Sequence, residues 1–542
     1  MRKSTLTYII FLVLISTSNA ISQRESTLDK AKSEEINKYL IKLNQIVKLA
    51  NTKHLEDVET KQLIDAAVKG LIQKLDPHTY YFTSEEVKLL DLERNGIHYS
   101  IGLNFVLMKD TATVLSVLEG GPAYNEGIRT GDRLLSINDS NLIGKSKVAI
   151  EELLNSGTKQ NPLIVSFLPY NKRNIVKKTI SPIKYPYFSV DASYLIDGTD
   201  IGYVAINRFM RNTHKELIDS IVDLTKKGMK KMIIDLRNNP GGSVEETYMA
   251  IDEFVGAGNV IFMMRGKDPI YNETYKSSSG GLFENIPLVV LVNKESASAS
   301  EIFAGAVQDL DRGLIIGETT YGKGLVQRPY QFFDGSELWL TVAQYFTPSG
   351  RSIQRPYEHN ESYGTLQDRI YLKDGMNIAH TTEVVPGASS QANMFRTRTG
   401  RTVVGKGGIT PDYIINDDTL TTKGKLIENK NLQDKFILDY YQKNKDSLNK
   451  VFVNNFDSYL HEYQISKQLF DAMLDYASTP DNKITEADIL GDVNHFKAIM
   501  KSRLAGFIWD DQKAKLVLLN DSEHLKKAIE LMPVAIQILN QK

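Results

Sequence analysis

The sequence contains no cysteine, and this absence excludes several chemistries at once. Disulfides, a thiolate nucleophile, a cysteine-ligated zinc ion and a lipid-modified N-terminal cysteine are all ruled out. An excess of charge of one sign is also missing, since 65 basic side chains stand against 66 acidic ones, a net charge of -1. No chain-wide basic field exists to hold nucleic acid or anionic lipid, so we expect neither as a partner.

The composition is otherwise that of a folded globular protein. Of the 542 residues, 42% are hydrophobic and 24% are charged, which excludes a disordered chain or a collagen-like repeat. At about 150 residues per domain, this length predicts three or four domains. A chain of this size builds its cores without covalent cross-links.

Residues 1–20 have the pattern of an export signal. Arg2 and Lys3 form a short basic region, and residues 6–15 are an apolar run that is about half as long as a bilayer crossing requires. Small residues lead up to Ala20, so we predict a signal peptide cleaved after Ala20 rather than a membrane anchor. The mature chain is then exported, to the periplasm, with no membrane span, and its lack of cysteine suits an oxidising compartment.

Hydrophobic periodicity divides the rest of the chain into four parts. Residues 21–92 and 417–542 have the apolar spacing of helices, whereas residues 93–188 read as a compact β-domain with short strands, glycine-rich turns and two helices. Strands and helices alternate over residues 189–416, as in an α/β layer architecture, with a polar insertion at 355–400. We therefore predict a multi-domain α/β protein with a β-domain before an α/β core and helical segments at both ends.

The first candidate site element is the turn after the buried strand expected at 232–236. It reads Asp-Leu-Arg-Asn-Asn-Pro-Gly-Gly and ends in Gly241 and Gly242. Two glycines at a strand-to-helix turn allow backbone N–H groups to point into a cavity, where they can stabilise an oxyanion. A Gly-Gly turn alone serves plain geometry more often than chemistry.

The second element follows the buried strand expected at 288–292. Three serines, Ser296, Ser298 and Ser300, alternate there with small residues before a helix that we expect to begin near Ser300. Small residues before a helix N-terminus allow close approach of a substrate. Capping of the helix by Ser298 or Ser300 explains the pattern equally well, so the residues alone leave both readings open.

The third element is Lys323, flanked by Gly322 and Gly324. An ordinary lysine, with a pKa of about 10.4, is neutral in about one molecule in 2500 at pH 7, and burial that lowers the pKa to about 8 raises this to about one in eleven. A neutral lysine beside a serine is a competent general base. Gln327 could orient such an amine without adding charge. Without the serines, a solvated lysine on a surface loop would be the better reading.

Other catalytic classes lack their motifs. The chain has no G-x-S-x-G elbow, no H-E-x-x-H, no P-loop and no dinucleotide-binding fingerprint. Of its nine histidines, His78 and His214 are the best candidates for a Ser-His-Asp triad, yet neither follows a strand end, and we expect His78 to belong to an aromatic connection at 78–82. We predict no metal site and no cofactor.

Together, the three elements resemble the C-terminal processing peptidases, also called tail-specific proteases. The motifs are Asp-Leu-Arg-Asn-Asn-Pro-Gly-Gly, Ser-Ala-Ser-Ala-Ser-Glu-Ile and Tyr-Gly-Lys-Gly-Leu-Val-Gln, in that order. The β-domain resembles a PDZ module. Leu-Asp-Pro-His before it, and Phe-Thr-Pro-Ser-Gly-Arg and Gly-Ile-Thr-Pro-Asp after the lysine, extend the resemblance over roughly residues 60–415.

The resemblance implies a role for each site residue. It makes Ser298 the nucleophile, Lys323 the base and Gln327 its supporting glutamine. The backbone N–H groups of Ala299 and, as first choice in the preceding turn, Gly241 would form the oxyanion hole. Ser296 is then a turn residue and Ser300 a helix cap.

The PDZ-like module implies how protein substrates are chosen. Residues Ile101, Gly102 and Leu103 occupy the position of the loop that holds a C-terminal carboxylate, although Asn104 stands where many such loops have glycine. Ile101 and Leu103 also suit plain core packing. The expected function is an exported serine endopeptidase that recognises accessible C-terminal tails of proteins, and the alternative is a non-catalytic PDZ scaffold. The PDZ-like module could also gate the cleft, and the outer helices are candidates for an adaptor site or a homo-oligomer interface.

Overall fold

The computed structural model describes residue 30 and residues 32–541, apart from 95–96, 187, 279, 357–393, 416–419 and 481–482. The predicted signal peptide and most of the predicted insertion at 355–400 lie outside the described residues. Among the helices of the described part, none is both long and apolar enough to cross a membrane.

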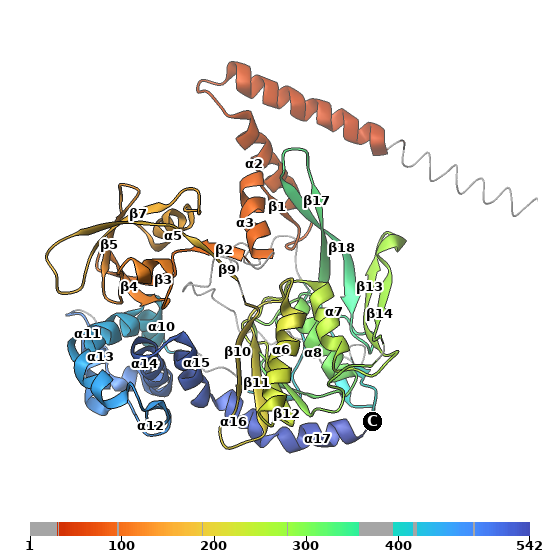
Figure 1. Cartoon of the computed structure of the whole chain (residues 1–542). Helices are drawn as coiled ribbons and strands as arrows, with labels where there is room; N and C mark the ends of the chain where they lie inside the picture. The colour runs from red at the N-terminus through yellow and green to blue at the C-terminus, as the bar shows by residue number, and fades with distance from the viewer. Residues whose placement is uncertain are drawn as a thin grey trace, which may run out of the picture.

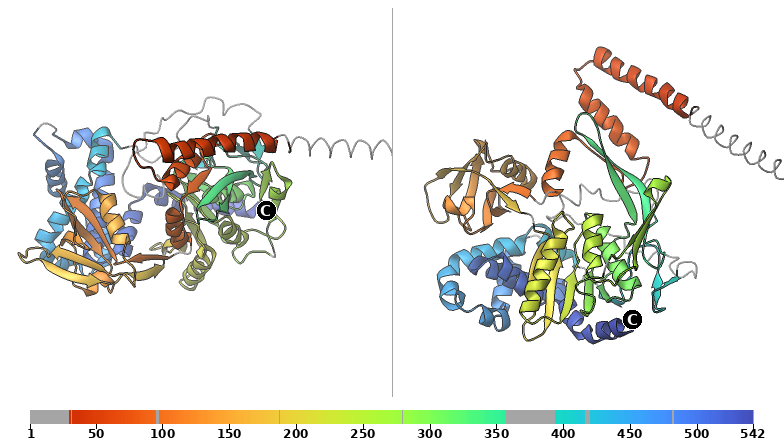
Figure 2. Two further views of the ribbon diagram at one scale, coloured as in Figure 1. Left: turned by 90° about the horizontal axis from the view of Figure 1, so that it is seen from above. Right: turned by 45° about the vertical axis from the view of Figure 1, so that its right-hand side comes forward.

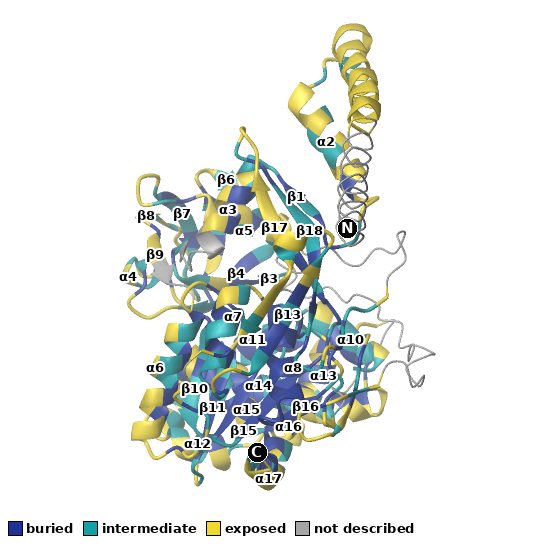
Figure 3. Ribbon diagram, turned by 90° about the vertical axis from the view of Figure 1, so that its right-hand side faces the viewer, coloured by how far each residue is buried: buried dark blue, intermediate teal, exposed yellow. Residues whose placement is uncertain are grey.

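The N-terminal segment projects from the rest of the chain (Figures 1 and 3). It contains a helix at 32–53, followed by α2 (Thr60–Ile72), β1 (Tyr80–Phe82) and α3 (Ser84–Arg94). The apolar stripe that predicts α2 is largely solvent-facing, since Ile72 is the one buried residue of that helix. Residues 78–82 are more than the connection we expected, because β1 pairs antiparallel with β18 (Glu337–Phe346).

The predicted β-domain is built on one antiparallel sheet in the order β3-β4-β5-β7-β8, with β6 beside β5. In this sheet β3 is an edge strand. The hydroxyl of Ser146 accepts the Ala149 N–H at 3.3 Å and so caps α5. The elements are β2 (Ile97–Ser100), β3 (Leu103–Met108), β4 (Thr111–Val117), α4 (Pro122–Asn125), β5 (Arg133–Ile137), β6 (Ser140–Asn141), α5 (Lys147–Asn155), β7 (Leu163–Leu168), β8 (Val176–Ile180) and β9 (Ile183–Pro186), which pairs with β2.

The α/β core contains a six-stranded sheet in the order β10-β11-β12-β15-β16-β21, parallel beyond β10. Helices α6, α7 and α8 cover one face, and α16 and α17 cover the other (Figures 1 and 2). This two-sided cover explains why β12 and β15 read as continuous apolar runs. The elements are β10 (Val190–Leu195), β11 (Ile201–Ile206), α6 (Thr213–Lys226), β12 (Lys231–Asp235), α7 (Val244–Asp252), β15 (Leu288–Val292), α8 (Ala299–Asp309), β16 (Leu314–Gly317) and β21 (Tyr413–Ile414).

A second sheet stands beside this core in the order β1-β18-β13-β14, and β17 pairs with β18 as a long hairpin. This sheet joins the N-terminal segment to the core. Its strand β1 belongs to the N-terminal segment, before the PDZ-like domain in sequence, whereas its other strands follow that domain. The remaining elements are β13 (Val260–Gly266), η1 (Pro269–Tyr271), β14 (Glu273–Lys276), β17 (Leu325–Gln331) and a small hairpin of β19 (Met394–Arg396) and β20 (Thr402–Val404).

Residues 417–542, predicted as one helical domain, pack in two places. Helices α10 to α15 share a core of their own, whereas α16 and α17 bury their apolar side chains against the central sheet. The Gln442 side-chain amide of α11 donates to the Thr130 carbonyl at 2.6 Å and so contacts the PDZ-like domain. The elements are α10 (Thr422–Asn429), α11 (Leu432–Phe452), α12 (Phe456–His461), α13 (Lys467–Ala477), η3 (Glu486–Asp492), α14 (Val493–Ile508), α15 (Asp511–Asn520), α16 (Glu523–Glu530) and α17 (Met532–Asn540).

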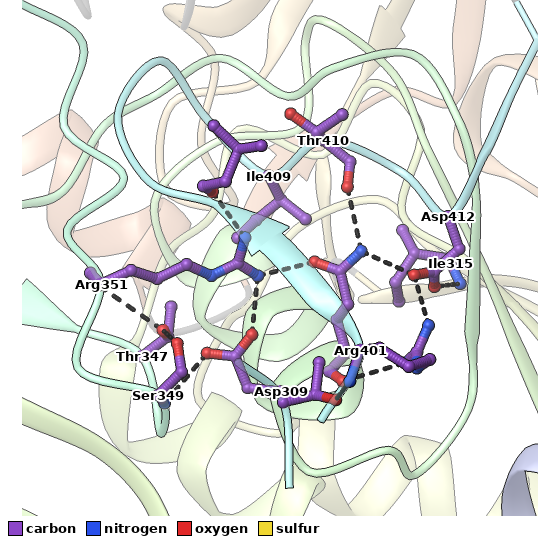
Figure 4. A network of polar contacts seen from close by, with 12 residues as sticks. Asp309, Ile315, Thr347, Ser349, Arg351, Arg401, Ile409, Thr410 and Asp412 are labelled. Carbon is purple, nitrogen blue, oxygen red and sulfur yellow. Dashed lines mark hydrogen bonds and ion pairs between the residues drawn. The ribbon is translucent and has the colours of Figure 1, made fainter. Parts of the chain in front are cut away.

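A buried ion pair fixes the far end of α8 (Figure 4). Arg351 and Asp309 are joined at 2.7 Å, and both side chains are 0% exposed. The same guanidinium donates to the Gln308 side-chain oxygen at 2.6 Å, and Gln308 in turn donates to Asp412 at 3.0 Å. Asp412 also accepts from Arg401 at 2.6 Å. The network thus ties the segments around Arg351 and Asp412 to α8.

Replacing Arg351 by methionine should destabilise the fold by about 3–5 kcal/mol, because it leaves the Asp309 carboxylate buried without its counter-charge. Chemical denaturation would measure this loss. The double variant Arg351→Met/Asp309→Leu, which leaves no isolated charge from the pair, should recover part of it. An Arg351→Met variant as stable as the wild type would contradict the buried pair.

Candidate functional site

Ser298 lies at the N-cap of α8, at the carboxyl edge of the central sheet. Its backbone has φ +55° and ψ -112°, a conformation that costs a residue with a side chain about 1–3 kcal/mol and persists only where the surroundings enforce it. Its side chain is half-buried. Helix α8 begins one residue later than Ser298, so Ser300 is inside the helix and is not the cap that we predicted.

The neighbouring serines have different surroundings from Ser298. Ser296 and Ser300 are both 0% exposed. The hydroxyl of Ser296 donates to the Leu236 carbonyl at 2.8 Å, and that of Ser300 donates to the Asn239 carbonyl at 2.9 Å. Both therefore connect α8 to the turn after β12, and of the three serines only Ser298 is partly accessible.

The glycine turn after β12 comes very close to Ser298. A Cβ built on Gly241 would lie 2.9 Å from the Ser298 Cβ and 2.9 Å from the Ala299 nitrogen, and the residue has φ +99°. Only glycine fits there. The turn is also cross-linked to the one after β15, because the side chains of Asn238 and Asn293 are joined at 2.9 Å.

Glu301 connects the serine turn to the lysine loop. One carboxylate oxygen, Oε2, accepts the main-chain N–H groups of Ser298 at 2.8 Å and of Lys323 at 2.9 Å. The other, Oε1, accepts from the Thr320 hydroxyl and the Gly322 N–H, both at 2.6 Å. Glu301 is 0% exposed, and this burial raises its pKa although the four hydrogen bonds act in the opposite direction. The carboxylate holds both segments in one arrangement.

Lys323 is buried, with 8% of its surface exposed. The backbone around it is held on both sides, since Gly322 accepts the Arg355 N–H at 2.9 Å and Gly324 accepts the Tyr345 N–H at 2.9 Å. The Tyr345 hydroxyl donates to the Ser298 carbonyl at 3.2 Å. The sequence allowed two readings of Lys323, a solvated residue on a surface loop or a buried base. In the structure Lys323 is buried, and its loop is fixed to the serine turn.

Gln327 begins a chain of polar contacts that leads to the N-terminal segment. Its side-chain nitrogen donates to the Thr341 hydroxyl at 3.1 Å, and that hydroxyl donates to Asp76 at 3.0 Å. Gln327 is on β17, the strand that directly follows the Lys323 loop.

The two amides expected to form an oxyanion hole differ in their present contacts. Ala299 is the first residue of α8, so its N–H is one of the four without a partner inside the helix. The N–H of Gly241 donates to the Asn239 side-chain oxygen at 2.9 Å.

In the PDZ-like domain, the predicted tail-binding residues precede and begin the edge strand β3. Ile101 is buried in the domain core and Leu103 packs against it, which is the packing role that the sequence also allowed. Gly102 has φ +78°, and its N–H donates to the Ser100 hydroxyl at 2.9 Å. Among the described strands β3 pairs with β4 alone, and a peptide could add as a strand along its other edge.

Sequence reasoning gave no role to Glu301, Asp76 or Thr341. Glu301 could have been found, because a glutamate three residues after a serine is the spacing of a capping box. No sequence signal joins Asp76 to Thr341. His214, the other histidine considered, is hydrogen-bonded to Glu253, the C-cap residue of α7. In the part of the chain that the structure describes, His, Asp and Glu residues form no cluster that could hold a metal ion.

Models of known protein families match several regions of the sequence. A model of peptidase family S41 matches residues 200–360, a PDZ domain model residues 113–165, and a model of the activating protease CtpB N-terminal domain residues 3–86. Residues 425–510 match a family of unknown function.

Similar proteins include probable CtpA-like serine proteases. That of Staphylococcus aureus (strain N315) is 32% identical over 339 residues, 61% of this chain and 65% of that protein. That of Staphylococcus epidermidis is 29% identical, over 63% and 68% of the two chains. Among solved structures, the photosystem II D1 C-terminal processing protease is 28% identical, over 56% and 82% of the chains, with a TM-score of 0.34.

The chain therefore spans about two thirds of the length of these two curated relatives. The fold we predicted, a PDZ domain before a protease-type core with helical segments on either side, is confirmed by the family models and the described elements. The region that carries the candidate site, residues 200–360, thus matches peptidase family S41.

Proposed function

We propose that this protein is a serine endopeptidase in which Ser298 is the nucleophile, Lys323 the general base and Gln327 the residue that orients the lysine amine. One observation carries the proposal. The buried Glu301 carboxylate accepts the main-chain N–H groups of both Ser298 and Lys323. A shared anchor of this kind keeps a nucleophile and its base in one geometry.

The chemistry follows from these groups. The neutral amine of Lys323 takes the Ser298 proton while the serine oxygen attacks the scissile carbonyl, and the protonated amine then donates to the leaving nitrogen. The oxyanion is stabilised by the Ala299 N–H, supported by the α8 dipole, and by the Gly241 N–H once it turns from Asn239. Water then hydrolyses the acyl-enzyme. No step requires a cofactor.

We also propose that the PDZ domain selects the substrate. A protein tail adds to the open edge of β3, and its terminal carboxylate lies at the loop of Ile101, Gly102 and Leu103. Export with cleavage after Ala20, to the periplasm, is proposed from the basic and apolar pattern of residues 1–20. An adaptor or a second copy on the outer helices also belongs to the proposal.

The test uses the chain from Ile21 onward and an unfolded protein substrate with an apolar C-terminal tail. We expect cleavage, followed by mass spectrometry, and loss of that cleavage in Ser298→Ala. Amidating the substrate's C-terminus should raise KM about tenfold or more, because it removes charge-assisted hydrogen bonds to the tail.

Two outcomes would contradict the proposal. Substrate that remains intact but binds wild type and Ser298→Ala alike would indicate a tail-binding scaffold instead of an enzyme. Cleavage that is unaffected by amidation would leave the protease but remove the terminal carboxylate as the recognised group.

A further inference from the structure

A hydrogen-bonded group of three polar side chains, Asp76, Thr79 and Thr341, contacts Gln327. Asp76, from the segment after α2, accepts the Thr341 hydroxyl at 3.0 Å on one carboxylate oxygen and the Thr79 hydroxyl at 2.6 Å on the other. Its first oxygen also accepts the His78 N–H at 2.8 Å. Thr341, on β18, accepts the Gln327 side-chain nitrogen at 3.1 Å.

The chemistry of these groups fixes the direction of every hydrogen bond. An ionised carboxylate can only accept hydrogen bonds. The hydroxyl groups of Thr79 and Thr341 therefore both donate their single proton to Asp76. The Thr79 oxygen lies 3.4 Å from the Thr341 oxygen but 2.6 Å from Asp76, so its proton belongs to the carboxylate. The Thr341 oxygen is then left as an acceptor, and the group that can satisfy it is an N–H.

This direction determines which way the amide of Gln327 is turned. A glutamine amide has one donating arm and one accepting arm, and the two exchange when the amide rotates by half a turn. The NH₂ arm is held by Thr341, so the carbonyl oxygen is the arm left to accept an N–H from a lysine amine. The reverse orientation would set the Gln327 carbonyl oxygen against the Thr341 oxygen, two acceptors with no proton between them.

We propose that Asp76 and Thr341 are positioning residues that lock the Gln327 side-chain amide with its carbonyl oxygen available to the Lys323 amine. The inference rests on the function proposed above and deepens it. It also gives the N-terminal segment a part in the site, because pairing of β1 with β18 brings Asp76 to Thr341, 265 residues further along the chain.

The kinetic test replaces Thr341 by valine, which has the same shape but cannot accept a hydrogen bond. We expect kcat to fall about tenfold with KM unchanged. The acid limb of the kcat profile should move to lower pH, because an acceptor that stabilises the protonated amine is lost. Thr341→Ser, which keeps the hydroxyl, should behave as the wild type, and thermal unfolding should show that all three proteins are folded at the assay temperature.

A double-mutant cycle separates positioning from general damage. In a Gln327→Ala background, Thr341→Val should cause no further loss, since the residue through which it acts is gone. Equal losses in both backgrounds, or a lower kcat without any shift in the pH profile, would overturn the inference.

A second readout does not depend on turnover. In protein labelled with ¹⁵N-glutamine, the NH₂ signal of Gln327 can be identified by its disappearance in Gln327→Ala. It should move in Thr341→Val and in Asp76→Asn but stay in place in Thr341→Ser. A signal that is unmoved in the first two variants would overturn the inference even if the wild type cleaves substrate. A wild type that cleaves nothing but gives the expected shifts would contradict the proposed function alone.

Discussion

Replacing Lys323 by methionine should reduce kcat/KM by about 10⁴-fold or more, the loss typical of removing a nucleophile or its base. The side chain is 8% exposed, so an apolar chain of similar length suits its surroundings and the fold should survive. Arginine at the same position should be equally inactive, because a guanidinium keeps its proton and cannot act as a base. Cleavage of the unfolded substrate by each purified variant would measure both losses.

A matched control is Lys294→Met. Lys294 is an exposed lysine in the turn before Ser298, and its replacement should leave kcat/KM unchanged. If Lys323→Met were folded and active, the base would have to be another group, and His78, which is buried, would need to be reconsidered.

Replacing Glu301 by glutamine should have the second-largest effect. The carboxylate accepts four hydrogen bonds, whereas an amide has one accepting oxygen and an NH₂ group that must face donors. Leaving buried donors unsatisfied costs about 3 kcal/mol of unfolding free energy. The serine turn and the lysine loop lose their common anchor, so kcat should fall about 100-fold, the scale of a small misplacement of reacting groups.

The stability penalty of Glu301→Gln should depend on pH. Burial raises the pKa of Glu301 above its ordinary value of 4.5. At pH values between 4.5 and this raised pKa, the folded chain therefore binds the proton more strongly than the unfolded chain does. As the pH falls through this window, the wild type gains stability from this group and the glutamine variant does not. The difference in unfolding free energy between them should therefore widen on acidification.

Denaturation of both proteins at several pH values would check this sign. Glu245→Gln is the control, since Glu245 is also in the first turn of a helix but is exposed, and it should change neither kcat nor stability. A Glu301→Gln variant with unchanged kcat would show that the serine and the lysine do not need the shared carboxylate.

Much of the architecture could be predicted because its signals are local. The apolar runs at 232–236 and 288–292 predict strands buried on both faces, and β12 and β15 are such strands. Gly228 follows Lys227, the C-cap of α6, and its φ of +97° is the conformation for which glycine at a helix end is a local signal. The three motif segments predicted for the site meet at one edge of a sheet because the strands before them are parallel neighbours.

What could not be predicted depends on partners that are distant in sequence. Thr213 and Glu216 have the spacing of a capping box, yet Asn212 is the N-cap of α6 and the Glu216 carboxylate accepts the N–H groups of Ser189 and Val190 instead. Strand β1 was missed for the same reason, since a three-residue strand becomes one only through its pairing with β18. Local spacing gives the residues that can bond, but tertiary packing selects the partners.

The way α16 and α17 cover the central sheet has a consequence for the order in which the chain can fold. The last strand of this sheet, β21, ends at Ile414, but one face of the sheet packs against apolar side chains between Leu519 and Ile538. A nascent chain that has already passed Lys323 therefore still exposes half of the sheet to solvent, which disfavours the native packing. We therefore expect the candidate site to reach its native packing only after α16 and α17 have been synthesised.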